Sequence, residues 1–164
     1  MAELTHERLL SLLRYDPVAG VFIWRVRVSN ISAGTIAGTP KAKGYRGIRI
    51  DGISYYEHRL AVFYMTGEWP ENDVDHRNLI RSDNRYANLR PATVSQNKMN
   101  RRAQSNNLLG VKGVSYDRRF DWYQARIKTN GRQRTIGVYG TLEEAAAAYE
   151  ASANDNFGAF ARAA

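Results

Sequence analysis

The chain has 164 residues, of which 43% are hydrophobic, which suffices for one ordinary domain or two small ones with marginal cores. It contains no cysteine, so disulfide bonds and cysteine-held zinc are excluded and no structural zinc is expected. The N-terminus lacks the uninterrupted apolar stretch of a signal peptide, and no segment approaches the ~18 apolar residues of a membrane span. We therefore expect a cytoplasmic protein with no membrane partner.

The charge is strongly positive, with 24 Lys and Arg against 16 Asp and Glu and a formal net charge of +8. Such a balance favours polyanionic partners, nucleic acid first, although many basic proteins merely have a solvated cationic surface. Between residues 101 and 134 only Asp117 and Asp121 oppose the cationic side chains, which favours nucleic acid. The cationic residues there are Arg101, Arg102, Lys112, Arg118, Arg119, Arg126, Lys128, Arg132 and Arg134.

The N-terminal part is predicted to contain a helix, three strands and a second helix. Thr5 can cap a helix over 5–14, in which leucines at helical spacing form an apolar stripe. The elements expected next are a turn at 15–20, a strand over 21–28, a polar loop over 29–44, strands over 45–50 and 53–58, and a helix over 59–67. The dipeptide Asp51-Gly52 predicts a two-residue hairpin, and Gly67 ends the second helix.

The segment "DVDHRNLIRSDNRYANLRPATVSQNKMN" is predicted to form two short strands and a helix. The expected bounds are a strand over 74–76, a polar loop over 77–87, a strand over 89–93 and a helix from about 93 to 102. After a polar linker, strands are predicted over 111–116, 122–129 and 132–139 and a helix over 142–154. Asn130-Gly131 is a hairpin dipeptide, and Thr141 can cap the last helix.

The pair Asp75-His76 has side chains that phosphodiester hydrolysis can use. Histidine can activate water near neutral pH, and a divalent cation on oxygen ligands can neutralise the phosphate and the leaving oxygen. Adjacent strand residues point to opposite faces, so Asp75 could face the following helix while His76 turns toward substrate, unless a kink brings both to one cleft. The alternative is an exposed loop histidine followed by turn and cap asparagines.

The spacing of "VDHRN…DNRYANLRPATVSQN" resembles that of HNH endonucleases, especially those of phages and mobile elements, over about 58–101. The resemblance implies a ββα-metal finger in which His76 is the general base. Asn88 then braces the loop and orients the base. Asp75 and Asn97 bind Mg²⁺ or another divalent cation such as Mn²⁺. Many members of the family have histidine at the position of Asn97.

Three further residues of this segment have less specific expectations. The resemblance makes Asn84 a structural loop residue. His58 is expected to have a hydrogen-bonded packing role. Arg90 is expected either to contact phosphate or to lie on the solvated surface.

The C-terminal stretch from "GVKGVSYDRRFDWYQARIK" to "ANDNFG" resembles an AP2 domain over about 108–160. The resemblance implies that one face of a three-stranded sheet contacts DNA through Lys112, Ser115, Arg126, Lys128, Gln133 and Thr135. Arg118 and Arg119, in the first hairpin loop, are expected to add phosphate contacts. Several of these positions differ from plant AP2 domains, so the plant target sequence does not carry over. The alternative is a half-exposed sheet that is basic for solubility.

The two resemblances together predict an α+β chain. An HNH finger of about 72–102 is embedded in a small N-terminal α+β domain over 1–102. A linker over 103–108 leads to an AP2-like domain over 109–164, in which a three-stranded antiparallel sheet packs on one helix.

The predicted function is metal-dependent endonucleolytic cleavage of double-stranded DNA, in a protein encoded by a phage or prophage and acting in the bacterial cytosol. One such site cuts one strand, so a double-strand break would need a homodimer or two sequential events. One alternative is a non-catalytic, sequence-specific DNA-binding regulator with a degenerate HNH scaffold. Another is a protein that binds or cleaves RNA.

Overall fold

The computed structural model describes residues 4–100, 103, 107–129 and 131–161. Arg101 and Arg102 at the predicted helix end, residues 104–106 of the predicted linker, and Asn130 lie outside the described residues. The chain divides into two compact units, Met1–Val94 and Ser95–Ala164. This division counts most of the helix that begins at Val94 with the second unit, whereas the sequence predicted that this helix belongs to the N-terminal domain over 1–102.

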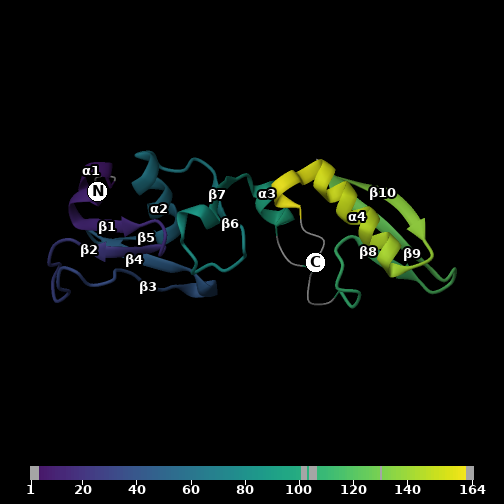
Figure 1. The fold of residues 1–164 in the computed structure, drawn as a ribbon, viewed down its shortest axis with the longest axis horizontal. Helices are drawn as coiled ribbons and strands as arrows, with labels where there is room; N and C mark the ends of the chain where they lie inside the picture. Colours follow the sequence, from purple (N-terminus) through teal and green to yellow (C-terminus); the bar gives the residue numbers. More distant parts are fainter. Residues whose placement is uncertain (1–3, 101–102, 104–106, 130, 162–164) are drawn as a thin grey trace. The chain divides into compact units, whose positions relative to one another are not determined.

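The first unit consists of short strands and two helices (Figure 1). In chain order the elements are α1 (His6–Leu12), β1 (Leu13–Asp16), β2 (Val21–Trp24), β3 (Thr39–Pro40), β4 (Arg46–Ile50), β5 (Ile53–Tyr56), α2 (Glu57–Thr66), β6 (Asp73–His76) and β7 (Leu89–Ala92). Three antiparallel sheets result, with strand orders β1-β2, β3-β4-β5 and β6-β7. Small sheets and helices together are compatible with the predicted α+β class.

The N-terminal segment forms a shorter helix than predicted, followed by a strand that was not predicted. Thr5 caps α1 as expected, because its hydroxyl accepts a hydrogen bond from the backbone N–H of Arg8. The helix ends at Leu12, and β1 then pairs with β2, although the sequence predicted helix and turn there. Alternation explains the strand, since Leu13 and Tyr15 are buried on one face of β1. The strand predicted over 21–28 ends at Trp24.

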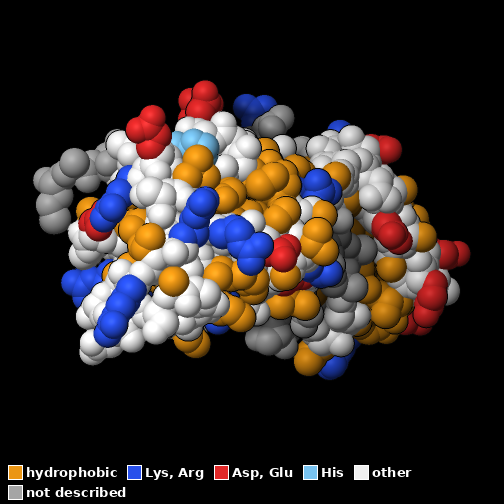
Figure 2. Space-filling model, turned by 60° about the vertical axis from the view of Figure 1, so that its left-hand side comes forward, with side chains coloured by type: hydrophobic (Ala, Val, Ile, Leu, Met, Phe, Trp, Pro, Cys, Tyr) orange, Lys and Arg blue, Asp and Glu red, His pale blue; other side chains and the backbone are white. Residues whose placement is uncertain are grey.

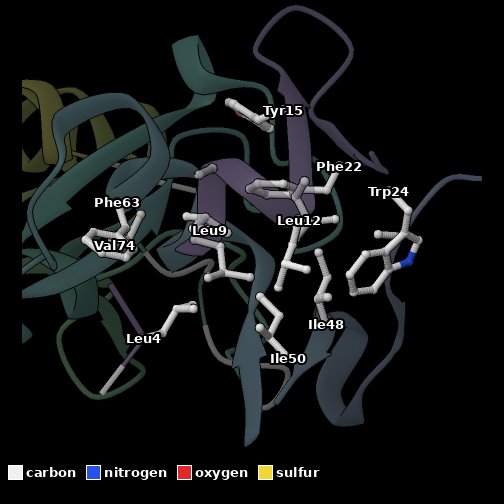
Figure 3. Packing of buried hydrophobic residues seen from close by; sticks show 14 of the residues in the cluster. Leu4, Leu9, Leu12, Tyr15, Phe22, Trp24, Ile48, Ile50, Phe63 and Val74 are labelled. Atoms are coloured by element: carbon white, nitrogen blue, oxygen red, sulfur yellow. The ribbon is translucent and has the colours of Figure 1, made fainter. Parts of the chain in front are cut away.

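The β4–β5 hairpin is confirmed, with Asp51 and Gly52 at φ values of 47° and 84°, as a type I′ turn requires. The core of the first unit lies between α1, α2 and the sheets, where the side chains labelled in Figure 3 converge. Its fully buried side chains include Leu9, Leu13, Phe22, Ile48, Ile50 and Leu60.

The second unit is a three-stranded antiparallel sheet with one helix packed on it. Its elements are β8 (Val114–Asp117), β9 (Trp122–Thr129), β10 (Arg132–Tyr139) and α4 (Leu142–Phe157), preceded by α3 (Val94–Met99). The sheet order is β10-β9-β8, and Thr141 and Glu144 cap α4 reciprocally. Ala125 and Ile127 of β9 pack on Ala145, Tyr149 and Ala153 of α4. Within the described residues, no helix has the length and apolar character needed to cross a bilayer.

Candidate active site

Asp75 and His76 are the last two residues of β6, which pairs with β7. The register sets Asp75 opposite Arg90 and His76 opposite Leu89, and the pleat directs the two neighbours to opposite faces. Both side chains are buried, each with 4% of its surface exposed. The alternative of an exposed loop histidine is therefore wrong.

Arg90 holds the carboxylate of Asp75. Its Nε donates to Asp75 Oδ2 at 2.9 Å, and its Nη2 lies 2.8 Å from the same oxygen. Arg90 is itself buried, so the expectation of a solvated surface side chain is wrong, while the phosphate contact stays a prediction. Directly opposed residues of an antiparallel pair share a face, which is why these two side chains meet.

The imidazole of His76 lies among aromatic rings and one carboxamide. Its ring centroid is 5.1 Å from that of His58 and 6.1 Å from that of Tyr45, and its Nε2 is 3.1 Å from Oδ1 of Asn84. Burial lowers the pKa of His76, against smaller opposing effects of the Asn84 hydrogen bond and the Asp75 charge. The environment thus favours the neutral imidazole, which is the form that can accept a proton.

The loop between β6 and β7 is braced by Asn88. Oδ1 of Asn88 accepts from the backbone N–H of Asn78, and its Nδ2 donates to Asn78 Oδ1 and to the carbonyl of Asp83. The carboxamide against the imidazole belongs instead to Asn84, whose Nδ2 donates to Glu57 Oε2 at 2.9 Å. The sequence predicted that Asn88 orients the imidazole of His76, whereas the side chain in contact with the ring is that of Asn84. Glu57 was not singled out from the sequence.

His58 packs between aromatic rings, with centroids 5.2 Å from Tyr45 and 5.4 Å from Tyr56. Its Nδ1 is buried without a hydrogen-bond partner among the described residues, so at that atom the expected hydrogen bond is not made. Burial, with smaller contributions from His76 and Arg59, lowers its pKa to about 3. His58 therefore stays neutral in the folded protein.

This buried histidine should make the fold sensitive to acid. The folded pKa of His58 lies below the ordinary value of 6.5, so the unfolded chain binds more protons as the pH falls below 6.5. Between pH 7 and pH 5, His58 should remove about 2 kcal/mol from the free energy of unfolding. His58→Phe keeps an aromatic ring at this position and cannot titrate. Urea unfolding at the two pH values should therefore show a smaller loss in the free energy of unfolding for this variant. An equal loss in both proteins would contradict the assignment to His58.

Asn97 lies in α3, which is counted mainly with the second unit, and its side chain is partly exposed. Its role as a metal ligand stays a prediction. Among the residues that the structure describes, no group of three or more His, Cys, Asp and Glu is placed to hold a metal ion.

In the second unit, register brings most of the predicted DNA contacts to one sheet face. Ala125 and Ile127 point toward α4, so Arg126 and Lys128 point away from it. Directly paired residues of neighbouring strands share a face of the sheet. Thr135 is paired with Arg126 and Gln133 with Lys128, so both lie on the same face. Ser115 is paired with Gln124, which lies on that face because it is two residues before Arg126. We call this set, Ser115, Arg126, Lys128, Gln133 and Thr135, the outer sheet face.

The remaining predicted contacts lie elsewhere in this unit. Lys112 precedes β8, and its Nζ donates to the carbonyl of Met99 at 2.7 Å. Arg118 and Arg119 lie in the turn after β8, where Arg119 pairs with Asp117 at 3.0 Å. Charge alone does not mark an interface, because Lys and Arg side chains are spread over the face drawn in Figure 2.

The segment that contains the Asp75-His76 pair is similar to known proteins. Residues 55–99 match the model of the HNH endonuclease family. The chain is also 36% identical over 88 residues to a protein of Acanthamoeba polyphaga mimivirus described as an uncharacterised HNH endonuclease. That alignment covers 54% of this chain and 44% of the relative, so the chain spans less than half of the relative's length. No solved structure matches the chain significantly. These similarities support an HNH endonuclease domain in the part of the chain that holds Asp75 and His76.

Proposed function

We propose that this chain is a metal-dependent DNA endonuclease, in which the HNH domain hydrolyses phosphodiester bonds and the C-terminal sheet holds duplex DNA. The observation that carries the proposal is the buried Asp75-His76 pair inside the segment that matches HNH endonucleases. Nuclease activity is what that family implies in general. The need for a cation, the roles of individual residues and the docking of DNA on an AP2-like sheet are parts of the proposal that go beyond the family.

The proposed oxygen donors suit a hard divalent cation. Asp75 would supply a carboxylate oxygen and Asn97 a carboxamide oxygen, which are ligands that Mg²⁺ prefers and Mn²⁺ accepts. Arg90 engages Oδ2 of Asp75 and would hold the carboxylate in place. Water and the substrate phosphate would complete the coordination.

His76 is the base in this mechanism. Its neutral imidazole accepts a proton from water as the water oxygen attacks phosphorus, and the bond from phosphorus to the leaving oxygen breaks. Burial lowers the pKa of His76 and so keeps the imidazole ready to accept that proton at neutral pH. When bound, Mg²⁺ would offset the negative charge of the phosphate and of the leaving oxygen.

Removal of the metal tests the activity directly. Purified protein with supercoiled plasmid and Mg²⁺ should give open-circular DNA, and excess EDTA should suppress this product because the phosphate charge is no longer offset. Gel electrophoresis of the two reactions measures the outcome. Nicking that persists at the same rate in EDTA would contradict metal dependence, and binding without nicking in Mg²⁺ or Mn²⁺ would favour the non-catalytic regulator.

The outer sheet face is the proposed docking surface for DNA. A sheet can enter the major groove, and its cationic side chains can hold phosphates or contact bases. Arg126 and Lys128 are exposed on this face, and Gln133 and Thr135 offer hydrogen bonds beside them. Arg118 and Arg119 in the adjacent turn, and Lys112 before β8, would extend the contact.

Neutralising the outer sheet face should weaken DNA binding. The double variant Arg126→Ala/Lys128→Ala is expected to bind duplex DNA at least about tenfold more weakly and to reduce the slope of log K against log salt by up to about 2, since each lost phosphate contact releases one fewer counterion. Fluorescence anisotropy over a salt series measures both quantities. Arg134→Ala is the matched control, because Arg134 is paired with the inward-facing Ile127.

The control should bind nearly as the wild type does. Equal losses in the double variant and in Arg134→Ala would place the DNA elsewhere. Competition of labelled duplex DNA with unlabelled RNA in the same assay distinguishes a DNA enzyme from an RNA-binding protein, which should prefer the RNA.

A further inference from the structure

A continuous chain of polar side chains runs from β4 to the imidazole of His76. Arg46 Nε lies 3.1 Å from both carboxylate oxygens of Glu57, the first residue of α2. Glu57 Oε2 accepts from Asn84 Nδ2 at 2.9 Å, and Asn84 Oδ1 lies 3.1 Å from His76 Nε2. Glu57 and Asn84 each expose only 1% of their surface, so water does not replace these contacts.

The chemistry of these groups fixes the direction of each hydrogen bond. Burial raises the pKa of Glu57, and the charge and hydrogen bonds of the adjacent Arg46 guanidinium oppose that rise. Paired with this guanidinium, the carboxylate can only accept a hydrogen bond from Asn84. The amino group of the Asn84 carboxamide must therefore face Glu57, which turns the carbonyl oxygen toward the imidazole. That oxygen can only accept, so Nε2 of His76 must carry the proton. In the neutral ring the lone pair then lies at Nδ1.

The region before residue 55, which the family match does not include, holds this arrangement in place. A Cβ at Gly38 would collide with Oε1 of Glu57, and a Cβ at Gly20 would collide with the backbone of Asn84 and Arg85. The hydroxyl of Tyr15 donates to the backbone carbonyl of Asn84. Two close approaches at glycine and one buried hydrogen bond thus fix both Glu57 and Asn84.

We propose that Asn84, held by Glu57 and Arg46, is a positioning residue that fixes the Nε2-protonated tautomer of His76 and makes Nδ1 the nitrogen that takes the proton of the attacking water. The inference rests on the proposed function, because it presumes that His76 is the base. It assigns a task to the N-terminal sheets, which present Arg46 and brace the carboxamide. Asn84 does not touch substrate in this scheme and acts only through the imidazole.

Nitrogen-15 NMR of the imidazole tests the tautomer without any cleavage. In labelled protein at about pH 8, where a histidine is neutral, the Nε2 signal should have the shift of a protonated nitrogen and the Nδ1 signal that of an unprotonated one. The His76 signals are identified by their loss in His76→Ala. The opposite pattern, with the proton on Nδ1, would overturn the inference even if the protein cuts DNA.

Glu57→Gln is the variant that separates positioning from binding. A glutamine can offer Asn84 either its oxygen or its amino group, so the carboxamide is no longer held and the tautomers should mix. The turnover number for nicking should fall at least about tenfold while KM for plasmid stays the same, as expected when an orienting partner is lost. An unchanged tautomer together with an unchanged turnover number would also overturn the proposal.

Ile50→Val is the matched control for simple destabilisation. It removes one methylene from the buried core of the same unit and none of the hydrogen bonds between Arg46 and His76, so the tautomer and the turnover number should stay those of the wild type. A mixed tautomer in this control would show that any loosening of the unit has the same effect, which counts against a specific role of Glu57. If instead His76→Ala still nicks plasmid, the assignment of His76 as the base fails, whereas the NMR result on the tautomer stands by itself.

Discussion

Replacement of His76 by alanine should abolish plasmid nicking while leaving DNA binding intact. General-base catalysis by a positioned imidazole contributes about 10²–10⁴-fold, so the nicking rate should fall by about 10³-fold. Binding should persist, because the outer sheet face lies in the other unit and does not include His76. A plasmid time course in Mg²⁺ measures the rate, and fluorescence anisotropy measures the affinity.

The chain offers a matched control for this variant in a second histidine of the same unit. The ring of His6 packs edge-on against Phe63, and its Nε2 lies 3.0 Å from the carbonyl oxygen of Tyr64, so it is remote from the proposed chemistry. His6→Ala should therefore nick DNA at nearly the wild-type rate. Normal cutting by His76→Ala would end the assignment of the base, and loss of cutting in both variants would point to a general loss of structure.

The local elements could largely be read from the sequence, because short-range chemistry determines them. Thr5 and Thr141 cap their helices, and Asp51-Gly52 forms the expected turn, since each depends on residues a few positions away. The strand β1 was missed for the opposite reason. Leu13 continues a helical leucine stripe in the sequence, and only pairing with β2 makes it a strand residue.

The candidate site was predicted as a set of residues but not as a set of contacts. The motif spacing singled out Asp75 and His76, and the structure adds that both are buried. That Arg90 meets Asp75 follows from strand register, which the predicted strand bounds could have supplied. The contact of Asn84 with Glu57 spans 27 positions and depends on tertiary packing, so no local pattern indicates it.

Loss of the buried ion pair between Asp75 and Arg90 should strongly lower the free energy of unfolding. Arg90→Met keeps much of the side-chain volume and removes the guanidinium, so Asp75 loses this partner in a position where water cannot replace it. Breaking a buried ion pair from one side costs roughly 3–5 kcal/mol, a large part of the 5–15 kcal/mol that is typical of a folded domain. Urea unfolding followed by circular dichroism should show this loss in the free energy of unfolding.

Two further variants show whether burial is the cause. The double variant Asp75→Leu/Arg90→Met removes both charges, so no carboxylate stays buried without its guanidinium, and it should recover part of the stability that Arg90→Met loses. Arg8→Met breaks the pair of Arg8 with Asp51, whose side chains are 50% and 55% exposed, and should leave the unfolding curve nearly unchanged. If the double variant is no more stable than Arg90→Met, the buried charge of Asp75 is not the reason for the loss. Equal losses in Arg90→Met and Arg8→Met would mean that burial does not set the strength of either pair. The expected order, with Arg90→Met least stable and Arg8→Met close to wild type, follows from solvent access to the two carboxylates.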